Sequence, residues 1–447
     1  MELNTTESQS LTSAEKTTAS NYFIANYPPF SVWSADAATS VATPALKSPP
    51  SNAALGMYLH IPFCRKRCHF CYFRVYTEKN AAEVQSYLDV VAREWELYAQ
   101  HPAIADRPLD FIYFGGGTPS FLSVRQLKAL IGRLEGVTPW NTAQEITFEC
   151  EPGTLTEPKL ASIRELGVTR LSLGIENFDD KILEVNGRAH RSPEIFRAYD
   201  FARSIGFPQI NIDLIAGMLG ETHDNWKVCI DKTIELSPDS VTIYQMELPF
   251  NTTISSDILK GTGGFSDNVA NWETKRQWVA EAFEALENAG YTVGSAYTAV
   301  KTPADTKFVY RDRLWQGADL IGLGVASFGH VSGVHVQNID SWGGYAEAVR
   351  QGQLPINRAY RPTDEERLIR ELVLQLKLGT IRPSYFQTKY GVNVRTQFSG
   401  AWTSLNNDGY LARADDDLVE LSREGLLRVD GLLPRFFLPE HTNIRYT

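Results

Sequence analysis

The sequence predicts an α/β protein: a partial (β/α)6 barrel of the TIM type, followed by a small, mainly helical C-terminal domain. The chain has 447 residues, which is enough for two or three compact units. From residue 57 onward, short apolar runs alternate with amphipathic segments, a pattern typical of βα units around a parallel sheet. Consecutive units of this kind place active residues at the carboxyl ends of the strands.

The N-terminal region precedes these units. Residues 1–20 and 36–53 are rich in small and polar residues and are expected to lack fixed structure. Between them, the aromatic density of residues 21–33 predicts a segment that docks on the body of the protein. A packing strap is favoured over a substrate lid, because buried aromatic side chains usually serve packing.

The expected strands are the apolar runs themselves, at residues 57–61, 109–114, 145–150, 169–174, 209–215 and 240–246. Between the first two runs, Val84, Leu88, Val91 and Trp95 recur at steps of three and four residues, which predicts a helix over residues 80–100. The later connections repeat this pattern, and Gly167 is the expected stop of one helix.

Composition shifts predict the domain boundaries. At residues 250–270, Asn, Thr and Gly interrupt the periodicity, and a Gly-rich stretch follows at 317–329. The predicted units are therefore a mostly flexible segment at 1–53, the barrel at 54–250, a barrel extension at 251–360 and the C-terminal domain at 361–447.

The charge balance and the cysteines exclude several classes of protein. The net charge of −10 disfavours broad binding of nucleic acid. No apolar run is long enough to span a membrane, and the N-terminus does not read as a secretory signal. Of five cysteines, three fall within eight residues, which is typical of a reducing compartment. The expected location is the cytoplasm.

Three cysteines occupy one loop just after the first predicted strand, namely Cys64, Cys68 and Cys71. Three thiolates on one short loop can hold three corners of an iron–sulfur cubane and leave the fourth iron open to a small molecule. The alternative is a structural zinc completed by His60 or His69, although structural zinc usually takes two separated ligand pairs. Cys150 and Cys229 are expected to be buried thiols.

The Cys-x3-Cys-x2-Cys loop resembles that of the radical S-adenosylmethionine (SAM) superfamily. The Tyr-x-His-Ile-Pro-Phe-Cys text at residues 58–64 and the Phe-Gly-Gly-Gly-Thr-Pro text at 114–119 resemble its oxygen-independent coproporphyrinogen III oxidase-like, or HemN-like, family. The resemblance implies a radical SAM barrel with a HemN-type C-terminal domain and a [4Fe–4S] cluster whose open iron chelates SAM. It also implies that SAM is cleaved to a 5′-deoxyadenosyl radical after one-electron reduction by a donor such as flavodoxin or ferredoxin.

The end of the second predicted strand is expected to contact SAM. Gly115, Gly116 and Gly117 carry no side chain there, so a ligand can touch backbone amides, and Thr118 adds a hydroxyl. Phe70, between two cluster cysteines, is expected to lie against the adenine ring.

Charged residues stand at the ends of the third, fourth and fifth predicted strands, namely Glu149, Glu151, Glu176 and Asp213. Arg188 is expected in the helix that follows Glu176. Charges are costly to bury at barrel strand ends, which favours ligand binding over a purely structural ion-pair network. The resemblance implies that Glu149, Arg188 and Asp213 hold the ribose hydroxyls and carboxylate of SAM. It also implies that Tyr58 packs beside the cofactor.

The resemblance covers more than one chemistry. Decarboxylases of the family carry a cysteine where this chain has Phe73 and a glutamine where it has Glu176. Haem chaperones of the family carry a His-Asn-x-x-Tyr-Trp element where residues 310–315 read Tyr-Arg-Asp-Arg-Leu-Trp. His330 and His335 lie nearby in sequence but are interpreted as structural.

Methyltransferases of the family bind two SAM molecules, and Ile215, Tyr310 and Phe328 are the expected walls of a second pocket. The favoured prediction is radical C-methylation or alkylation of an unsaturated or aromatic metabolite, with Glu176 or Glu247 in proton transfer. Oxidative decarboxylation of coproporphyrinogen III is the alternative, and a non-enzymatic haem chaperone is the alternative of another class. The expected partner is a small molecule, tetrapyrrole or aromatic.

Overall fold

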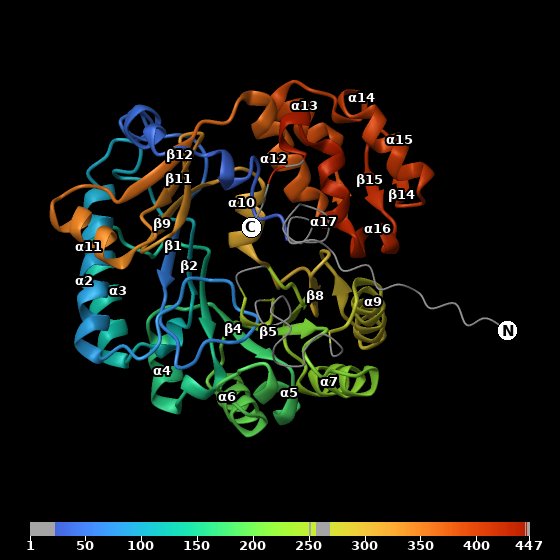
Figure 1. The fold of residues 1–447 in the computed structure, drawn as a ribbon, viewed down its shortest axis with the longest axis horizontal. Coiled ribbons are helices and arrows are strands. Elements are labelled where there is room, and N and C mark those ends of the chain that lie inside the picture. The colour runs from blue at the N-terminus through green and yellow to red at the C-terminus, as the bar shows by residue number, and fades with distance from the viewer. Residues whose placement is uncertain (1–22, 250–251, 256–268, 443, 445–447) are drawn as a thin grey trace.

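A computed structural model describes residues 23–249, 252–255, 269–442 and 444 (Figure 1). Its central strands are β1 (Leu55–Ile61), β2 (Phe111–Gly116), β3 (Glu145–Cys150), β4 (Arg170–Glu176), β5 (Gln209–Ala216) and β6 (Ser240–Gln245). They lie side by side in sequence order, and every neighbouring pair is parallel. The six predicted strands are confirmed, each to within two residues at either end.

A helix follows each of the first five strands and covers the outer side of the sheet (Figure 1). These helices, two of which follow β4, are α2 (Ala81–Tyr98), α3 (Val124–Val137), α4 (Glu157–Glu165), α5 (Asp180–Val185), α6 (Ser192–Ser204) and α7 (His223–Leu236). Asn80 begins α2 with a reciprocal capping box, accepting from Glu83 N while the Glu83 carboxylate accepts from Asn80 N. The predicted stop at Gly167 is confirmed, since its φ of +86° follows the end of α4.

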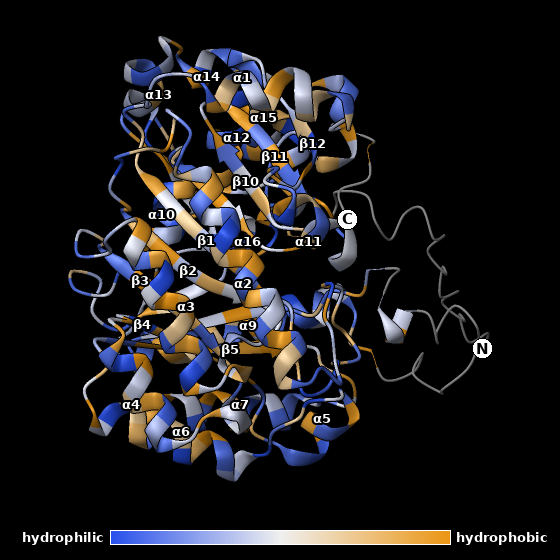
Figure 2. Cartoon of the chain, turned by 90° about the vertical axis from the view of Figure 1, so that its left-hand side faces the viewer, coloured by the Kyte–Doolittle hydropathy of each residue, from blue (hydrophilic) through white to orange (hydrophobic). Residues whose placement is uncertain are grey.

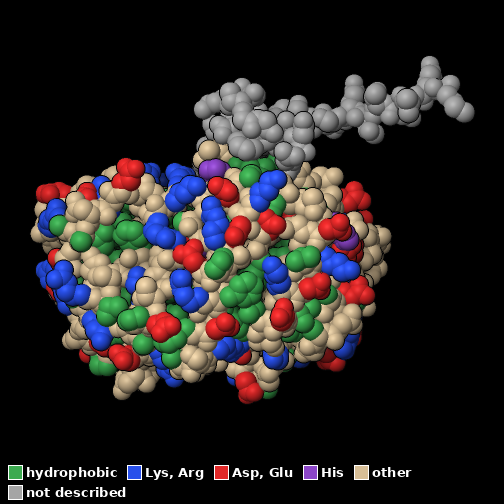
Figure 3. Space-filling model, turned by 90° about the horizontal axis from the view of Figure 1, so that it is seen from below, with side chains coloured by type: hydrophobic (Ala, Val, Ile, Leu, Met, Phe, Trp, Pro, Cys, Tyr) green, Lys and Arg blue, Asp and Glu red, His purple; other side chains and the backbone are tan. Residues whose placement is uncertain are grey.

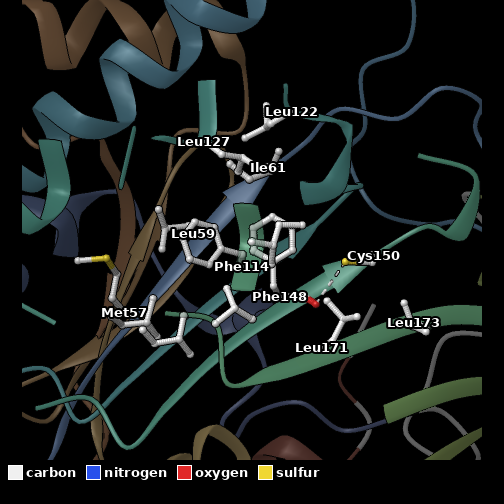
Figure 4. Close-up of a cluster of buried hydrophobic side chains, with 14 of the residues drawn as sticks. Met57, Leu59, Ile61, Phe114, Leu122, Leu127, Phe148, Cys150, Leu171 and Leu173 are labelled. Carbon is white, nitrogen blue, oxygen red and sulfur yellow. Dashed lines mark hydrogen bonds between the residues drawn. The ribbon is translucent and has the colours of Figure 1, made fainter. Parts of the chain in front are cut away.

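Alternation along the strands separates the core from the site. Met57, Leu59 and Ile61 of β1 pack in the main hydrophobic cluster with Phe114 and Phe148 from the next two strands (Figure 4). Because successive side chains point to opposite faces of a sheet, the intervening residues point into the barrel. Figure 2 shows the strands crossing the middle of the molecule between helices that mix apolar and polar residues.

The sheet continues on both sides of the parallel strands and stays open. In the described residues its order is β12-β11-β10-β9-β1-β2-β3-β4-β5-β6-β8-β7. The added strands are β7 (Thr292–Val293), β8 (Thr298–Val300), β9 (Asp319–Leu323), β10 (Phe328–Val331), β11 (Val334–Asn338) and β12 (Ile356–Tyr360). β9 pairs parallel with β1. β10 pairs antiparallel with β9, β11 with β10 and β12 with β11. Helices α9 (Trp272–Asn288), α10 (Val309–Trp315) and α11 (Trp342–Arg350) belong to the same region.

Residues 23–53 of the N-terminal region adopt defined structure. The expectation that residues 36–53 lack fixed structure is wrong, because a π-helical turn at Ala38–Ala42 leads into α1 (Thr43–Leu46). Ala42 and Ala45 pack on Val334 and Val336 of β11. Because alanine occurs in linkers as well as in cores, the sequence does not indicate that these two residues are buried. In the strap, residues 23–33, Ile24 and Tyr27 are fully buried. Residues 1–22 lie outside the described residues.

Residues 364–441 form helices and a small antiparallel sheet, drawn in orange to red in Figure 1. The helices are α12 (Asp364–Leu376), α13 (Pro383–Tyr390), α14 (Val394–Gln397), α15 (Ser399–Asn407), α16 (Arg423–Leu427) and α17 (Val429–Leu432), and the strands are β13 (Thr380–Ile381), β14 (Leu411–Ala414) and β15 (Val419–Leu421). These elements share a hydrophobic cluster with the strap. None of the helices in the described residues combines the length and apolarity that crossing a bilayer requires. Acidic and basic side chains are interspersed on the face in Figure 3.

Candidate functional site

A cavity of about 420 Å³ opens at the carboxyl ends of the parallel strands. It is the size of a small-molecule site. The structure brings together in its wall the three loop cysteines and most of the predicted site residues: Phe70, Gly116, Gly117, Thr118, Glu149, Glu176, Arg188, Asp213, Ile215 and Glu247. Residues separated by up to 183 positions in sequence thus meet because parallel strands end at one edge.

The three thiols lie on one loop that backbone bonds anchor on both sides. Tyr76 N donates to Pro62 O at 2.6 Å, and His69 N donates to Asn186 O at 3.0 Å. Thr118 Oγ1 donates to Cys64 Sγ at 3.3 Å, and Arg188 Nη1 donates to Cys68 Sγ at 3.4 Å. A hydroxyl and a guanidinium aimed at sulfur stabilise thiolates, which are the form that binds iron.

Without a bound cation, burial raises the pKa of the Cys64 thiol to about 12 and also raises that of Cys71. A group that holds these sulfurs as thiolates therefore has to bring positive charge of its own, as iron does. Among the described residues, no three His, Cys, Asp or Glu side chains are arranged to hold a single metal ion. His69, one candidate for a fourth ligand, has its Nδ1 2.9 Å from Val185 O.

Two carboxylates stand at the ends of β3 and β5. Glu149 accepts from Tyr113 Oη at 2.6 Å and from Gly116 N at 3.2 Å. Burial raises its pKa to about 7, so its proton is exchangeable near neutral pH. Asp213 accepts from Ser172 Oγ at 2.8 Å, and burial raises its pKa as well.

Glu176 leaves β4 at a bulge. The register with β5 shifts between Gly174 and Glu176, and Glu176 has a φ of +66°, which is rare for a residue with a side chain. Its Oε1 lies 3.5 Å from Arg188 Nη2, and burial raises its pKa to about 7 against the lowering effect of that guanidinium. The prediction that Arg188 lies in a helix is wrong: α5 ends at Val185, and Arg188 follows the turn at Asn186 and Gly187 in irregular backbone.

The glycines after β2 are required by space. A Cβ on Gly116, whose φ is +110°, would lie 2.4 Å from His60 Nδ1. A Cβ on Gly117 would lie 2.9 Å from both Ile61 O and Pro62 C. These glycines let the end of β2 approach the start of the cysteine loop.

Four positions that were expected to contact SAM or a second pocket lie outside the cavity lining, namely Tyr58, Gly115, Tyr310 and Phe328. Tyr58 and Tyr310 pack on Tyr113, which lines the cavity, with ring centroids at 5.9 Å and 4.4 Å from the Tyr113 ring. Phe328 packs against Phe30 and Trp33 of the strap, at 5.9 Å and 5.6 Å. Neither Tyr310 nor Phe328 lines this cavity, and the proposal that the two wall a second SAM pocket stays a prediction.

Several residues that line the cavity were not predicted from the sequence. Tyr113 could have been found from strand alternation, since it lies between the core residues Ile112 and Phe114. Arg65, inside the cysteine motif, donates a bidentate pair of hydrogen bonds to the Glu151 carboxylate, from Nη2 at 3.0 Å and from Nε at 3.1 Å. Phe23 comes from the strap, and no local signal points to it.

Comparison with known proteins gives this cavity a context. Residues 58–232 match the model of the radical SAM superfamily. The chain is 27% identical over 372 residues to the heme chaperone HemW of Bacillus subtilis, covering 83% of this chain and 96% of that protein. It is 27% identical over 420 residues to the oxygen-independent coproporphyrinogen III oxidase of Pseudomonas aeruginosa, covering 88% of each.

Among solved structures, coproporphyrinogen III oxidase (HemN) of Escherichia coli shares the fold, with a TM-score of 0.80 at 23% identity. The match covers 93% of this chain and 96% of that one. The superfamily implies a [4Fe–4S] cluster and SAM, and the three thiols around one cavity fit that cluster. Residues 58–232 therefore form a radical SAM domain, and the chain is similar along most of its length to the HemN-type oxygen-independent coproporphyrinogen III oxidases.

Proposed function

We propose that this protein is a radical SAM oxidase that decarboxylates propionate side chains of a porphyrinogen, with coproporphyrinogen III as the first substrate to test. The observation that carries the proposal is the cavity, in which three thiols and acidic strand ends stand together with aromatic and basic residues. The similarity to coproporphyrinogen III oxidases supports this reaction, whereas the comparisons lend no support to methylation.

The cysteine loop and the strand ends would hold the cofactors. Cys64, Cys68 and Cys71 would ligate the cluster, and Glu149, Arg188 and Asp213 would bind the polar groups of SAM, with Phe70 against its adenine. When bound, cluster and SAM supply a radical that abstracts a hydrogen atom. Glu176 and Glu247, whose pKa values burial raises to about 7 and about 8, can hold or release a proton near neutral pH.

The rest of the cavity suits an anionic substrate that carries pyrrole rings. Lys66 and Arg67 are exposed at its rim, where they can attract carboxylates. Tyr72 and Tyr244, 37% and 43% exposed, offer ring faces.

Converting a propionate to a vinyl group removes one hydrogen atom, one carbon dioxide and one electron, so an electron acceptor is needed besides the donor that reduces the cluster.

The experiment is anaerobic turnover of reconstituted protein with coproporphyrinogen III, SAM, a reductant and an electron acceptor. Carbon dioxide release and the matching mass loss in the tetrapyrrole are expected, together with 5′-deoxyadenosine. A variant with all three loop cysteines changed to alanine should lose the brown chromophore and both products, whereas Cys229→Ala, a buried thiol far along the chain in α7, should keep them.

Two outcomes would contradict the proposal. Transfer of label from methyl-labelled SAM into a product, without carbon dioxide, would favour methylation. Stoichiometric haem binding without any 5′-deoxyadenosine would favour a haem carrier, as the heme chaperone HemW is named.

A further inference from the structure

The strap is held by a buried cluster of charges in the C-terminal domain. Lys377, at the end of α12, is fully buried, and its Nζ lies 2.6 Å from Ile24 O and 3.0 Å from Asp430 Oδ1. The same Asp430 oxygen accepts from Ile24 N at 3.0 Å. Asp430 also accepts a hydrogen bond from Tyr297 Oη. Both polar groups of the Ile24 backbone are thus satisfied by one ion pair.

Lys377 also fixes the neighbouring aromatic side chain. Its Nζ lies 3.5 Å from the ring centroid of Phe23 and 5.4 Å from that of Tyr297. The face of an aromatic ring attracts a desolvated ammonium electrostatically. The backbone of Lys377 accepts from Ala296 N at 2.9 Å, so one residue joins the C-terminal domain, the barrel extension and the strap.

Phe23 reaches the cavity on the other side of this contact. Its backbone N donates to Glu247 Oε1 at 2.5 Å, and both residues line the cavity. The Phe23 ring lies 5.2 Å from that of Tyr297, which lies 6.3 Å from that of Tyr244. Tyr244 lines the cavity too, so the three rings form a continuous row whose two ends face it.

We propose that Phe23 is a specificity-determining residue that packs against the ring system of the substrate, and that Lys377 is its positioning residue. This inference rests on the proposed function for the identity of the substrate. Phe23 carries no polar group, so what it adds to the cavity is a ring face and volume, which select an unsaturated, ring-bearing substrate. Through Lys377 and Phe23, the C-terminal domain thereby influences which substrate the barrel cavity binds.

The first test compares two strap aromatics. Phe23→Ala should raise the KM for coproporphyrinogen III about tenfold, the loss of one aromatic contact, with a much smaller change in kcat. Phe23→Tyr should restore most of that loss. Phe30→Ala is the matched control, since Phe30 packs on Phe328 outside the cavity lining. Equal KM values for wild type and Phe23→Ala would overturn the specificity role.

The second test addresses Lys377. Lys377→Met should raise the KM as Phe23→Ala does, and combining the two should add nothing further, because both remove one interaction. Lys389→Met is the control: Lys389 pairs with Glu371 at 2.7 Å in the same domain. An additive double variant would mean that Lys377 acts through general stability, which overturns the positioning role.

A third measurement separates this inference from the proposed function. Hydrogen exchange at the amides of Phe23 and Ile24, which bond to Glu247 and Asp430, should speed up at least tenfold in Lys377→Met and stay unchanged in Lys389→Met. If wild type turns over coproporphyrinogen III but these rates do not change, the positioning role fails. If wild type neither binds coproporphyrin III nor turns over its reduced form, the proposed function and the specificity role fail, while the exchange result still decides the positioning.

Discussion

Replacing Gly117 by alanine is a direct test of the cysteine loop geometry. The new Cβ would lie 2.9 Å from Ile61 O, 2.9 Å from Pro62 C and 3.0 Å from Phe63 N. All three are backbone atoms immediately before Cys64, so no side-chain rotation relieves the contact. Reaching the 3.4 Å of ordinary contact requires a shift of about 0.5 Å, and overpacking of this kind destabilises by about 1 to 3 kcal/mol.

The shift would also strain the hydrogen bond from Gly117 N to Ile61 O, now 2.8 Å. We expect Gly117→Ala to lose iron and sulfide after reconstitution and to unfold at lower denaturant than wild type. Gly132→Ala is the control: a Cβ there meets nothing within 4 Å, and alanine favours helix α3 by about 0.5 to 1 kcal/mol. Wild-type iron content together with wild-type stability in Gly117→Ala would refute the reasoning.

Three further predictions follow from buried charges. Because burial raises the pKa of Glu149 to about 7, SAM affinity measured by calorimetry on reconstituted protein should fall several-fold from pH 8 to 6, and Glu149→Gln should remove that dependence. Burial raises the pKa of Glu247 from 4.5 to about 8, so its contribution to stability is present below pH 4.5 and lost as pH rises towards 8. Glu247→Gln should therefore be more stable than wild type at pH 8 and differ little at pH 5. Arg107→Ala breaks the buried pair with Asp319, 2.8 Å apart, and should lower the free energy of unfolding by about 3 to 5 kcal/mol, against less than about 0.5 for the exposed Arg423→Ala.

The parallel strands and the cysteine site could be read from the sequence because their signals are local. A strand covered by a helix needs apolar residues at alternate positions, as Met57, Leu59 and Ile61 show. The thiol spacing likewise lies within one loop. The helical turns at residues 38–46 were missed because small residues and a proline resemble a linker, and their burial depends on β11, nearly 300 positions further along the chain.

Contacts between distant positions leave no local signal in the sequence. Phe328 packs against Trp33 of the strap, almost 300 positions away in sequence. The contact between Lys377 and Ile24 joins positions 353 residues apart, and no periodicity records it. Such partners are chosen by tertiary packing, which a single sequence does not display.

The pairing of β1 with β9 has a consequence for biosynthesis. On the ribosome, residues 55–245 emerge well before residue 319. The edge of β1 that pairs with β9 therefore stays unpaired while the intervening residues are translated. At typical elongation rates the delay is on the order of ten seconds. An unpaired strand edge recruits other chains, so the nascent protein is exposed to aggregation during this interval. Residues 58–232 expressed alone would never cover that edge, and we expect that fragment to be recovered as inclusion bodies.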